Sequence, residues 1–231
     1  MLKQKTEEQF GDAFIGSDAI AKLVSGSGYF IRELDTFHGR PDVVLFDAQP
    51  ITDLSLRNAI LASPSSMSFA SVFLALKSSR KSLDIEDIAM TAGISLSYTH
   101  NTVRALYKEG LLIRLKNGKF KLHPNATIPH TTIVSIEFKL HDWKKALKQS
   151  VRHRAFADKA FVIMPSSKRE LLLSNIDSFA KFGISVAVFD PVTNFYETLH
   201  ESNSDRLSEV SYLDVLGRSW INNANLAPVA A

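Results

Sequence analysis

The pattern of apolar and polar positions predicts three successive blocks of short elements. In the first block, apolar residues at helical spacing predict a helix over 6–24. β-rich runs then predict strands over 29–34 and 42–46, and a short helix over 55–62 follows. Ser and Pro residues at 63–66 end this block.

The second block reads as three helices and a hairpin. Helices are predicted over 67–76, 84–92 and 95–109, with strands over 111–115 and 119–123. Asn117-Gly118 lies between the two strands, and Asn-Gly flanked by alternating segments is the strongest short hairpin signal.

The third block alternates strands with helices, which is typical of an α/β sheet. The predicted elements are strands over 131–140, 159–164 and 184–189, and helices over 142–156, 168–182 and 206–221. The strand over 184–189 is wholly apolar, as expected at the centre of a sheet. Residues 222–231 lack periodicity, so a loose tail is expected there.

Composition places the chain among globular proteins and excludes some chemistry. Of 231 residues, 45% are hydrophobic and 22% charged, and there is no cysteine. Disulfides, thiolate metal sites and cysteine nucleophiles are therefore excluded. No apolar run is long enough for a membrane span, and no signal peptide is recognisable, so we expect a cytoplasmic protein without a membrane partner.

Charge is concentrated in two basic segments between acidic ends. Residues 66–124 carry nine Lys/Arg against four Asp/Glu, and residues 139–169 carry nine against two. Uneven blocks of this kind are the usual footprint of nucleic-acid binding, so we expect a polyanion to contact the middle of the chain. The alternative is that the blocks are two solvated helix faces.

The order of elements over 67–123 resembles the winged helix-turn-helix family. The third helix would then read double-stranded DNA, and the hairpin would touch its backbone or minor groove. The candidate DNA-binding residues are Ser97, Tyr98, His100, Asn101, Arg104 and Lys108 on the helix, and Arg114, Lys116, Lys119 and Lys121 on the hairpin. Winged helices also serve as dimerisation or protein-docking modules, and these residues would then form a solvated face.

Candidate chemistry lies in the flanking segments. Pro41-Asp42 opens one apolar strand, and Glu137 and Lys139 share one face at the end of another. Two carboxylates on adjacent strands can hold Mg²⁺, which lowers the pKa of bound water. An adjacent lysine can orient or deprotonate that water, or stabilise the charge that develops on phosphate. Alternatively, Asp42 is a turn residue and Glu137 and Lys139 form a surface ion pair.

Residues 1–60 and 126–190 resemble the PD-(D/E)xK, or restriction-endonuclease-like, nuclease superfamily, on the Pro41-Asp42 and Glu137-Phe138-Lys139 motifs. The resemblance implies a mixed sheet flanked by helices and a deoxyribonuclease dependent on Mg²⁺ or Mn²⁺. It implies that Asp42, Glu137 and the Phe138 carbonyl bind the metal and that Lys139 is catalytic. Residues that complete the site would be Gln149 and one of Glu7, Glu8 or Glu33, and the cations that hold phosphates would be Lys144, Lys145, Lys148, Arg152 and Arg154.

Taken together, the two resemblances predict a winged helix inserted into a nuclease-like α/β domain. The predicted parts are residues 1–63 and 126–221 for the nuclease-like domain, 64–125 for the insertion and 222–231 for the tail. Symmetric cleavage of both strands would need two active sites, which suggests a homodimer. The alternatives are a DNA-binding transcriptional regulator with a silent nuclease-like domain, and a partner-docking protein with no nucleic-acid role.

Overall fold

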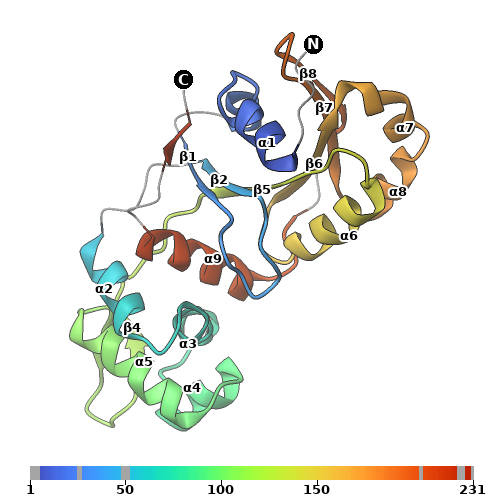
Figure 1. Cartoon of the computed structure of the whole chain (residues 1–231). Helices are drawn as coiled ribbons and strands as arrows, with labels where there is room; N and C mark the ends of the chain where they lie inside the picture. Colours follow the sequence, from blue (N-terminus) through green and yellow to red (C-terminus); the bar gives the residue numbers. More distant parts are fainter. Residues whose placement is uncertain (1–5, 25–27, 48–52, 203–204, 223–226, 230–231) are drawn as a thin grey trace. The chain divides into compact units, whose positions relative to one another are not determined.

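The chain forms two compact units, which are described separately (Figure 1). The computed structural model describes residues 6–24, 28–47, 53–202, 205–222 and 227–229. Unit 1 consists of Met1–Gln49, Thr131–Ser208 and Asn225–Ala231. Unit 2 consists of Pro50–His130 and Glu209–Ala224.

Unit 1 is built on a mixed seven-stranded sheet in the order β8-β7-β6-β5-β2-β1-β9. The strands are β1 (Tyr29–Arg32), β2 (Val43–Asp47), β5 (Thr132–Phe138), β6 (Lys159–Pro165), β7 (Ser185–Asp190), β8 (Phe195–His200) and β9 (Ala227–Pro228). β5, β6 and β7 are parallel, whereas the other pairs are antiparallel. Unit 1 is therefore an α/β structure with a mixed sheet flanked by helices, as the sequence predicts at this level.

Helix α1 (Glu7–Ile15) covers one face of the sheet through aromatic packing. The rings of Phe10 and Phe14 lie with their centroids 5.2–5.9 Å from those of Phe138 and Phe189, and all four side chains are buried. The predicted helix over 6–24 is shorter than expected because the hydroxyl of Ser17 donates to the Phe14 carbonyl and ends the regular turn pattern. A short 3-10 helix over Ile20–Leu23 follows.

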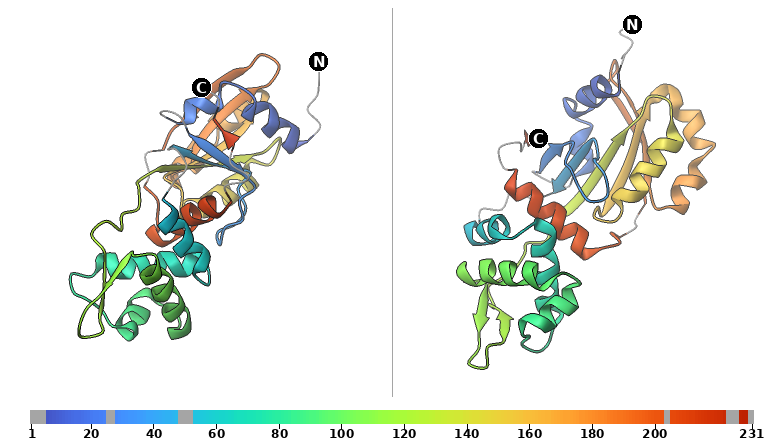
Figure 2. Two further views of the ribbon diagram at one scale, coloured as in Figure 1. Left: turned by 90° about the vertical axis from the view of Figure 1, so that its left-hand side faces the viewer. Right: turned by 60° about the horizontal axis from the view of Figure 1, so that its bottom comes forward.

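Helices α6 (Trp143–His153), α7 (Arg169–Leu173) and α8 (Ile176–Lys181) cover the other face (Figure 2). Ala146 of α6 is packed into one buried cluster with Ala160 and Val162 of β6. The single helix predicted over 168–182 is in fact broken between α7 and α8. The Asn175 side chain donates to the Leu171 carbonyl there, which removes an acceptor from the regular helix pattern.

The two outer strands of the sheet were not predicted. β8 pairs antiparallel with β7, but its residues are half-buried or exposed, so they carry no clear alternation in the sequence. β9 pairs with β1, which corrects the expectation of a loose tail for Ala227–Pro228; residues 223–226 and 230–231 lie outside the described part.

Unit 2 contains the predicted helices and hairpin in the predicted order. Its elements are α2 (Leu54–Ala62), α3 (Ser66–Ser78), α4 (Ile85–Ala92), α5 (Leu96–Lys108), β3 (Leu112–Arg114), β4 (Phe120–Leu122) and α9 (Glu209–Ile221). Gly93 caps α4 with a positive φ of 67°, a conformation that favours glycine, and this turn leads into α5. Leu83 forms an isolated bridge to Phe120, next to the hairpin.

Helices α2 and α9 belong to unit 2, whereas the sequence assigned their residues to the flanking domain. A buried contact between the Ser66 hydroxyl of α3 and Asp214 of α9 shows why. Asp214 also accepts from Arg218 at 3.0 Å, so its carboxylate is satisfied inside this unit. Within the described ranges, no single helix is long and apolar enough to cross a membrane; α2 and α3 meet the length and composition test only together, bent by 115°.

Candidate active site

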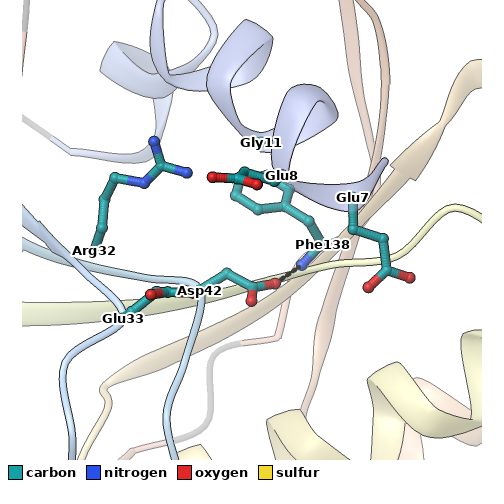
Figure 3. Close-up of a pocket in the computed structure, with 7 residues that line it drawn as sticks. All are labelled: Glu7, Glu8, Gly11, Arg32, Glu33, Asp42 and Phe138. Carbon is teal, nitrogen blue, oxygen red and sulfur yellow. Dashed lines mark hydrogen bonds between the residues drawn. The ribbon is translucent and has the colours of Figure 1, made fainter. Parts of the chain in front are cut away.

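Asp42, the residue before β2, and Glu137 of β5 lie beside each other in the sheet of unit 1, although they are remote in the chain. β2 and β5 are antiparallel with Val43 opposite Ile136, so the residue before β2 reaches the end of β5. Asp42 Oδ2 accepts a hydrogen bond of 2.7 Å from the backbone N–H of Phe138 (Figure 3). The two predicted carboxylates, Asp42 and Glu137, are therefore brought together at the start of β2 and the end of β5.

Lys139, the residue after β5, is buried and contacts this pair of carboxylates. Its Nζ donates to Glu137 Oε1 at 2.7 Å and to the Phe138 carbonyl at 2.8 Å, and it lies 3.1 Å from Glu7 Oε2. Glu137 is 0% exposed and Lys139 only 4%. These two residues are therefore a buried ion pair, which differs from the surface pair considered as the alternative.

Burial raises the pKa of both carboxyl groups at the site. For Asp42, desolvation outweighs the hydrogen bond from the Phe138 amide and the attraction of Lys139. For Glu137, desolvation and then repulsion from Asp42 raise the pKa to about 7, despite the hydrogen bond from Lys139. A nearby positive charge stabilises the ionised form of a buried carboxyl group, so Asp42 and Glu137 together favour the presence of a cation beside them.

The lysine behaves as that positive charge in this arrangement. Burial acts to lower the pKa of Lys139, but the hydrogen bond and the charge of Glu137 outweigh burial, and the pKa is raised. Lys139 is therefore an ammonium ion here. Its chemistry is to stabilise negative charge and to donate hydrogen bonds, and it is not poised to accept a proton.

A cavity of about 280 Å³ opens beside Asp42. Its lining, drawn in Figure 3, consists of Glu7, Glu8, Gly11, Arg32, Glu33, Asp42 and Phe138. All three glutamates left open by the sequence line this cavity, and Glu7 also reaches Lys139. The Glu33 carboxylate is paired with Arg40 at 2.8 Å, whereas the Glu7 carboxylate lies 3.1 Å from Lys139. Glu7 is therefore the glutamate that is in contact with the other candidate site residues.

The oxygen donors at the site fit a hard divalent cation. Besides its bond to Lys139, Glu137 has a second oxygen, Oε2, that is buried without a hydrogen-bond partner among the described residues. Mg²⁺ is commonly bound by one or two carboxylates, with water and substrate phosphate completing its shell. In the described ranges no group of three or more His, Cys, Asp or Glu side chains is arranged to hold a metal. A cation here would therefore rely on Asp42, Glu137, the Phe138 carbonyl and non-protein oxygens.

Further buried polar atoms lie on β5 and on α6, which pack against each other. Ser135 and Glu137 pair with Ala160 and Val162, which pack against α6, so both face that helix. Side-chain atoms that are buried without a hydrogen-bond partner among the described residues are Ser135 Oγ, Glu137 Oε2, Gln149 Oε1, Ser150 Oγ and His153 Nδ1. Buried groups of this kind are usually satisfied by internal water. We call this set the buried polar cluster.

Gln149 was predicted to complete the site; the structure places it on α6 with its Oε1 buried, and Ser150 and His153, which were not predicted, are buried on the same helix. His153 is 2% exposed, and burial, followed by the charge of Arg152, lowers its pKa to about 4. The available signal was the position of Ser150 and His153, which follow Ala146 at helical spacing on the buried side of α6. We missed it because a polar residue on an otherwise charged helix reads as solvent-exposed.

The predicted phosphate-binding cations of α6 divide into two groups. Lys144, Lys145, Lys148 and Arg152 are exposed. Arg154, in contrast, donates to the carbonyls of Phe182 at 2.9 Å and Asp205 at 3.1 Å, so its guanidinium holds the fold of unit 1 together. The exposed cations therefore run along α6 from Lys144 in its first turn to Arg152 in its last turn.

In unit 2, the polar residues predicted on the third helix are exposed on α5. They are Ser97, Tyr98, His100, Asn101, Arg104 and Lys108. Asn101, Arg104 and Lys108 line a cleft of about 460 Å³ together with residues 62–64 from the end of α2. Leu96, the first residue of α5, is 49% exposed, whereas Thr99 and Thr102 on the same helix are buried.

On the hairpin, Arg114, Lys116 and Lys121 are exposed, whereas Lys119 is partly engaged. Lys119 Nζ lies 3.5 Å from Asp84 and 3.9 Å from Asp87, at the start of α4. These contacts tie the hairpin to the start of α4 and leave three hairpin cations exposed.

Comparison of the chain with protein-family models, with curated proteins and with solved structures finds no match. The function is therefore argued from the geometry of the site alone.

Proposed function

We propose that this protein is a metal-dependent phosphodiesterase that cuts DNA, with a PD-(D/E)xK-type site in unit 1 and a winged helix-turn-helix in unit 2. One observation carries the proposal. Asp42, Glu137 and Lys139, brought from separate parts of the chain, meet at the ends of adjacent strands, and the hydrogen bond from Phe138 to Asp42 links their positions. A buried ion pair beside an acidic cavity is costly to keep, which favours a functional reason for it.

In this mechanism the chain's own residues bind, orient and stabilise. Asp42, Glu137 and the Phe138 carbonyl would hold Mg²⁺ or Mn²⁺, which supplies Lewis-acid activation of the phosphodiester and of water when bound. Lys139, as an ammonium, would donate to the phosphoryl oxygens as negative charge develops on them. If the Lys139 ammonium moves away from Glu7 or Glu137, its N–H groups become free to donate to the phosphoryl oxygens. Lys144, Lys145 and Lys148 would hold neighbouring phosphates.

DNA docking is assigned to unit 2. Ser97, Tyr98, His100 and Asn101 of α5 offer side chains to base edges. The cations that would contact phosphates are Arg104, Lys108, Arg114, Lys116, Lys119 and Lys121. This part of the proposal stands on the order of elements and the exposure of these residues.

The test is cleavage of duplex DNA by the purified protein with Mg²⁺ or Mn²⁺. Asp42→Ala and Lys139→Ala are each expected to lower the rate of cleavage at least about a hundredfold. The affinity for duplex DNA should change by less than about threefold, because neither residue belongs to the docking surface. Asp35→Ala is the matched control, because Asp35 is an exposed carboxylate outside the cavity. Wild-type protein that cuts neither DNA nor RNA would contradict the proposal.

A second function, a DNA-binding regulator with a silent nuclease-like domain, is favoured by one observation. Lys139 Nζ fills the position on which Glu137, Phe138 and Glu7 oxygens converge. If the ammonium is a permanent substitute for a cation, unit 1 would be scaffold. Sequence-specific DNA binding that is unaffected by Glu137→Ala, with no cleavage under any divalent cation, would identify this case.

A further inference from the structure

A second surface of unit 1 lies on the side of α6 that faces α8, away from the buried polar cluster. It is a groove of about 380 Å³ lined by Trp143, Lys144, Leu147, Lys148, Val151, Ser178 and Phe182. Trp143, Leu147 and Val151 repeat at one-turn intervals along α6, so they form a continuous apolar stripe. Phe182, 44% exposed, forms part of the facing wall at the end of α8.

The aromatic floor of the groove is held in place from below. The Trp143 ring packs on the buried ring of Phe179, with centroids 5.6 Å apart and an angle of 46° between the planes. Trp143 itself is only half-buried. A large, supported and partly exposed indole ring is a stacking platform that loses little freedom when it binds a second flat ring.

Cations flank this platform, and no Asp or Glu lines the groove. Lys144 Nζ lies over the Trp143 ring, 5.7 Å from its centre, so a base that stacks there takes the place of this ammonium. Lys148 follows one helical turn later. Lys145, also exposed, lies on the same turn as Lys144. The groove therefore offers an aromatic face and a row of positive charges to one ligand.

We propose that this groove binds a single strand of nucleic acid, with a base stacked on Trp143 and phosphates held by Lys144 and Lys148. Alternating aromatic and cationic contacts are the general means by which proteins hold single strands without sequence preference. Duplex DNA fits less well, because its base faces are already stacked on each other. A protein segment would need to bring its own acidic residues to match the lysines.

The inference refines the substrate class of the proposed function. Trp143 follows Lys139 by four residues, so a short segment of chain connects the groove to the candidate catalytic lysine. The inference that the groove binds a single strand depends only on the residues that line the groove. The further claim that the bound strand is the one that is cut rests on the proposed function. The substrate would then be DNA with a single-stranded segment.

The test is the intrinsic fluorescence of the full chain, titrated in EDTA with single-stranded oligothymidylate and with a duplex of equal length. The chain has two tryptophans, and Trp220 is only 2% exposed, so quenching reports mainly on Trp143. We expect quenching by the single strand at concentrations where the duplex causes none, and no quenching in Trp143→Phe beyond a residual change. Lys144→Glu with Lys148→Glu is expected to weaken binding about tenfold or more.

Matched controls separate this surface from others. Lys22→Glu removes a cation that lies 5.5 Å from the Tyr196 ring elsewhere in unit 1, and it should leave quenching unchanged. Lys139→Ala should also leave quenching unchanged, so loss of cleavage and loss of groove binding are distinguishable. Equal quenching by duplex, unchanged affinity in the Lys144 and Lys148 variant, or self-association that Trp143→Ala abolishes would overturn the inference.

Discussion

Glu137 and His153 are both buried, and burial shifts their pKa values in opposite directions. The pKa of Glu137 is raised to about 7, and that of His153 is lowered to about 4. In each case the neutral form is favoured over the charged one, because a charge in the interior loses its hydration. The two residues therefore contribute to the pH dependence of stability with opposite signs.

His153 is expected to destabilise the protein at acid pH. In the unfolded chain its pKa returns to about 6.5, so the unfolded state takes up a proton that the folded state refuses until about pH 4. Stability is lost as pH falls through this window, by roughly 2–3 kcal/mol in total. Urea unfolding followed by Trp143 fluorescence at pH 7 and 4.5 should show this loss in the wild type and a smaller loss in His153→Gln. An equal loss in both proteins would contradict the assignment.

Glu137 is expected to act in the other direction. Its folded pKa lies above the unfolded value of 4.5, so the folded state holds a proton that the unfolded state releases, and stability falls as pH rises from about 4.5 to 7. Glu137→Gln removes this contribution. In the same unfolding measurement without divalent cations, the stability of Glu137→Gln relative to wild type should rise with pH across that window. If the difference in stability between Glu137→Gln and wild type stayed constant across this pH window, the Glu137 carboxylate would already be ionised at pH 5 and the prediction would be wrong.

At the scale of elements, α1 closes on the site through Gly11. A Cβ at Gly11 would lie 2.9 Å from Cδ2 of Phe138, whose backbone N–H holds Asp42. Gly11→Ala should therefore destabilise unit 1 by roughly 1–3 kcal/mol despite the better helix propensity of alanine, and it should weaken cleavage as well. Thermal unfolding and the cleavage assay measure these effects.

Gly217→Ala is the matched control for that helix substitution. Gly217 is also helical and buried, but a Cβ there would meet its nearest neighbour, Ser66, at an ordinary 3.4 Å. The expected result is unchanged or slightly higher stability, because the propensity gain of up to ~1 kcal/mol is not offset by a clash. A similar loss for both variants would show that the contact with Phe138 is not special.

Much of the element pattern was predictable from the sequence. β5, β6 and β7 are apolar runs, and their burial between two helical layers is what such runs indicate. β8 was missed because its residues are half-buried or exposed, so this edge strand has no clear alternation to detect. The break between α7 and α8 depends on a local side-chain hydrogen bond of Asn175, which competes with the helix in a way that periodicity does not register.

The candidate site was predictable in its residues but less so in its surroundings. Asp42, Glu137 and Lys139 were chosen from strand ends, and register brings them together. The role of Glu7, the burial of Glu137 and the buried polar cluster depend on how α1 and α6 pack against the sheet. Packing of that kind is a tertiary property that a local sequence pattern does not contain.

At the scale of the whole molecule, exposed cations in both units determine how binding responds to salt. Arg104 of α5 is exposed and has no acidic partner within 4.0 Å among the described residues. Arg104→Ala should weaken duplex binding similarly across sequences and lower the slope of log affinity against log salt by about 1. Fluorescence anisotropy over a salt series measures both. An unchanged slope would remove Arg104 from the DNA contacts.

The central claim is that Asp42 and Glu137 form one cation site, and Mn²⁺ soaked into crystals of the protein tests it most directly. We expect an anomalous peak in contact with both carboxylates and with the Phe138 carbonyl, and a Lys139 side chain displaced from Glu137. Asp42→Asn crystals soaked in the same way should lose the peak. No peak between these carboxylates, with Lys139 still bonded to Glu137, would contradict the account.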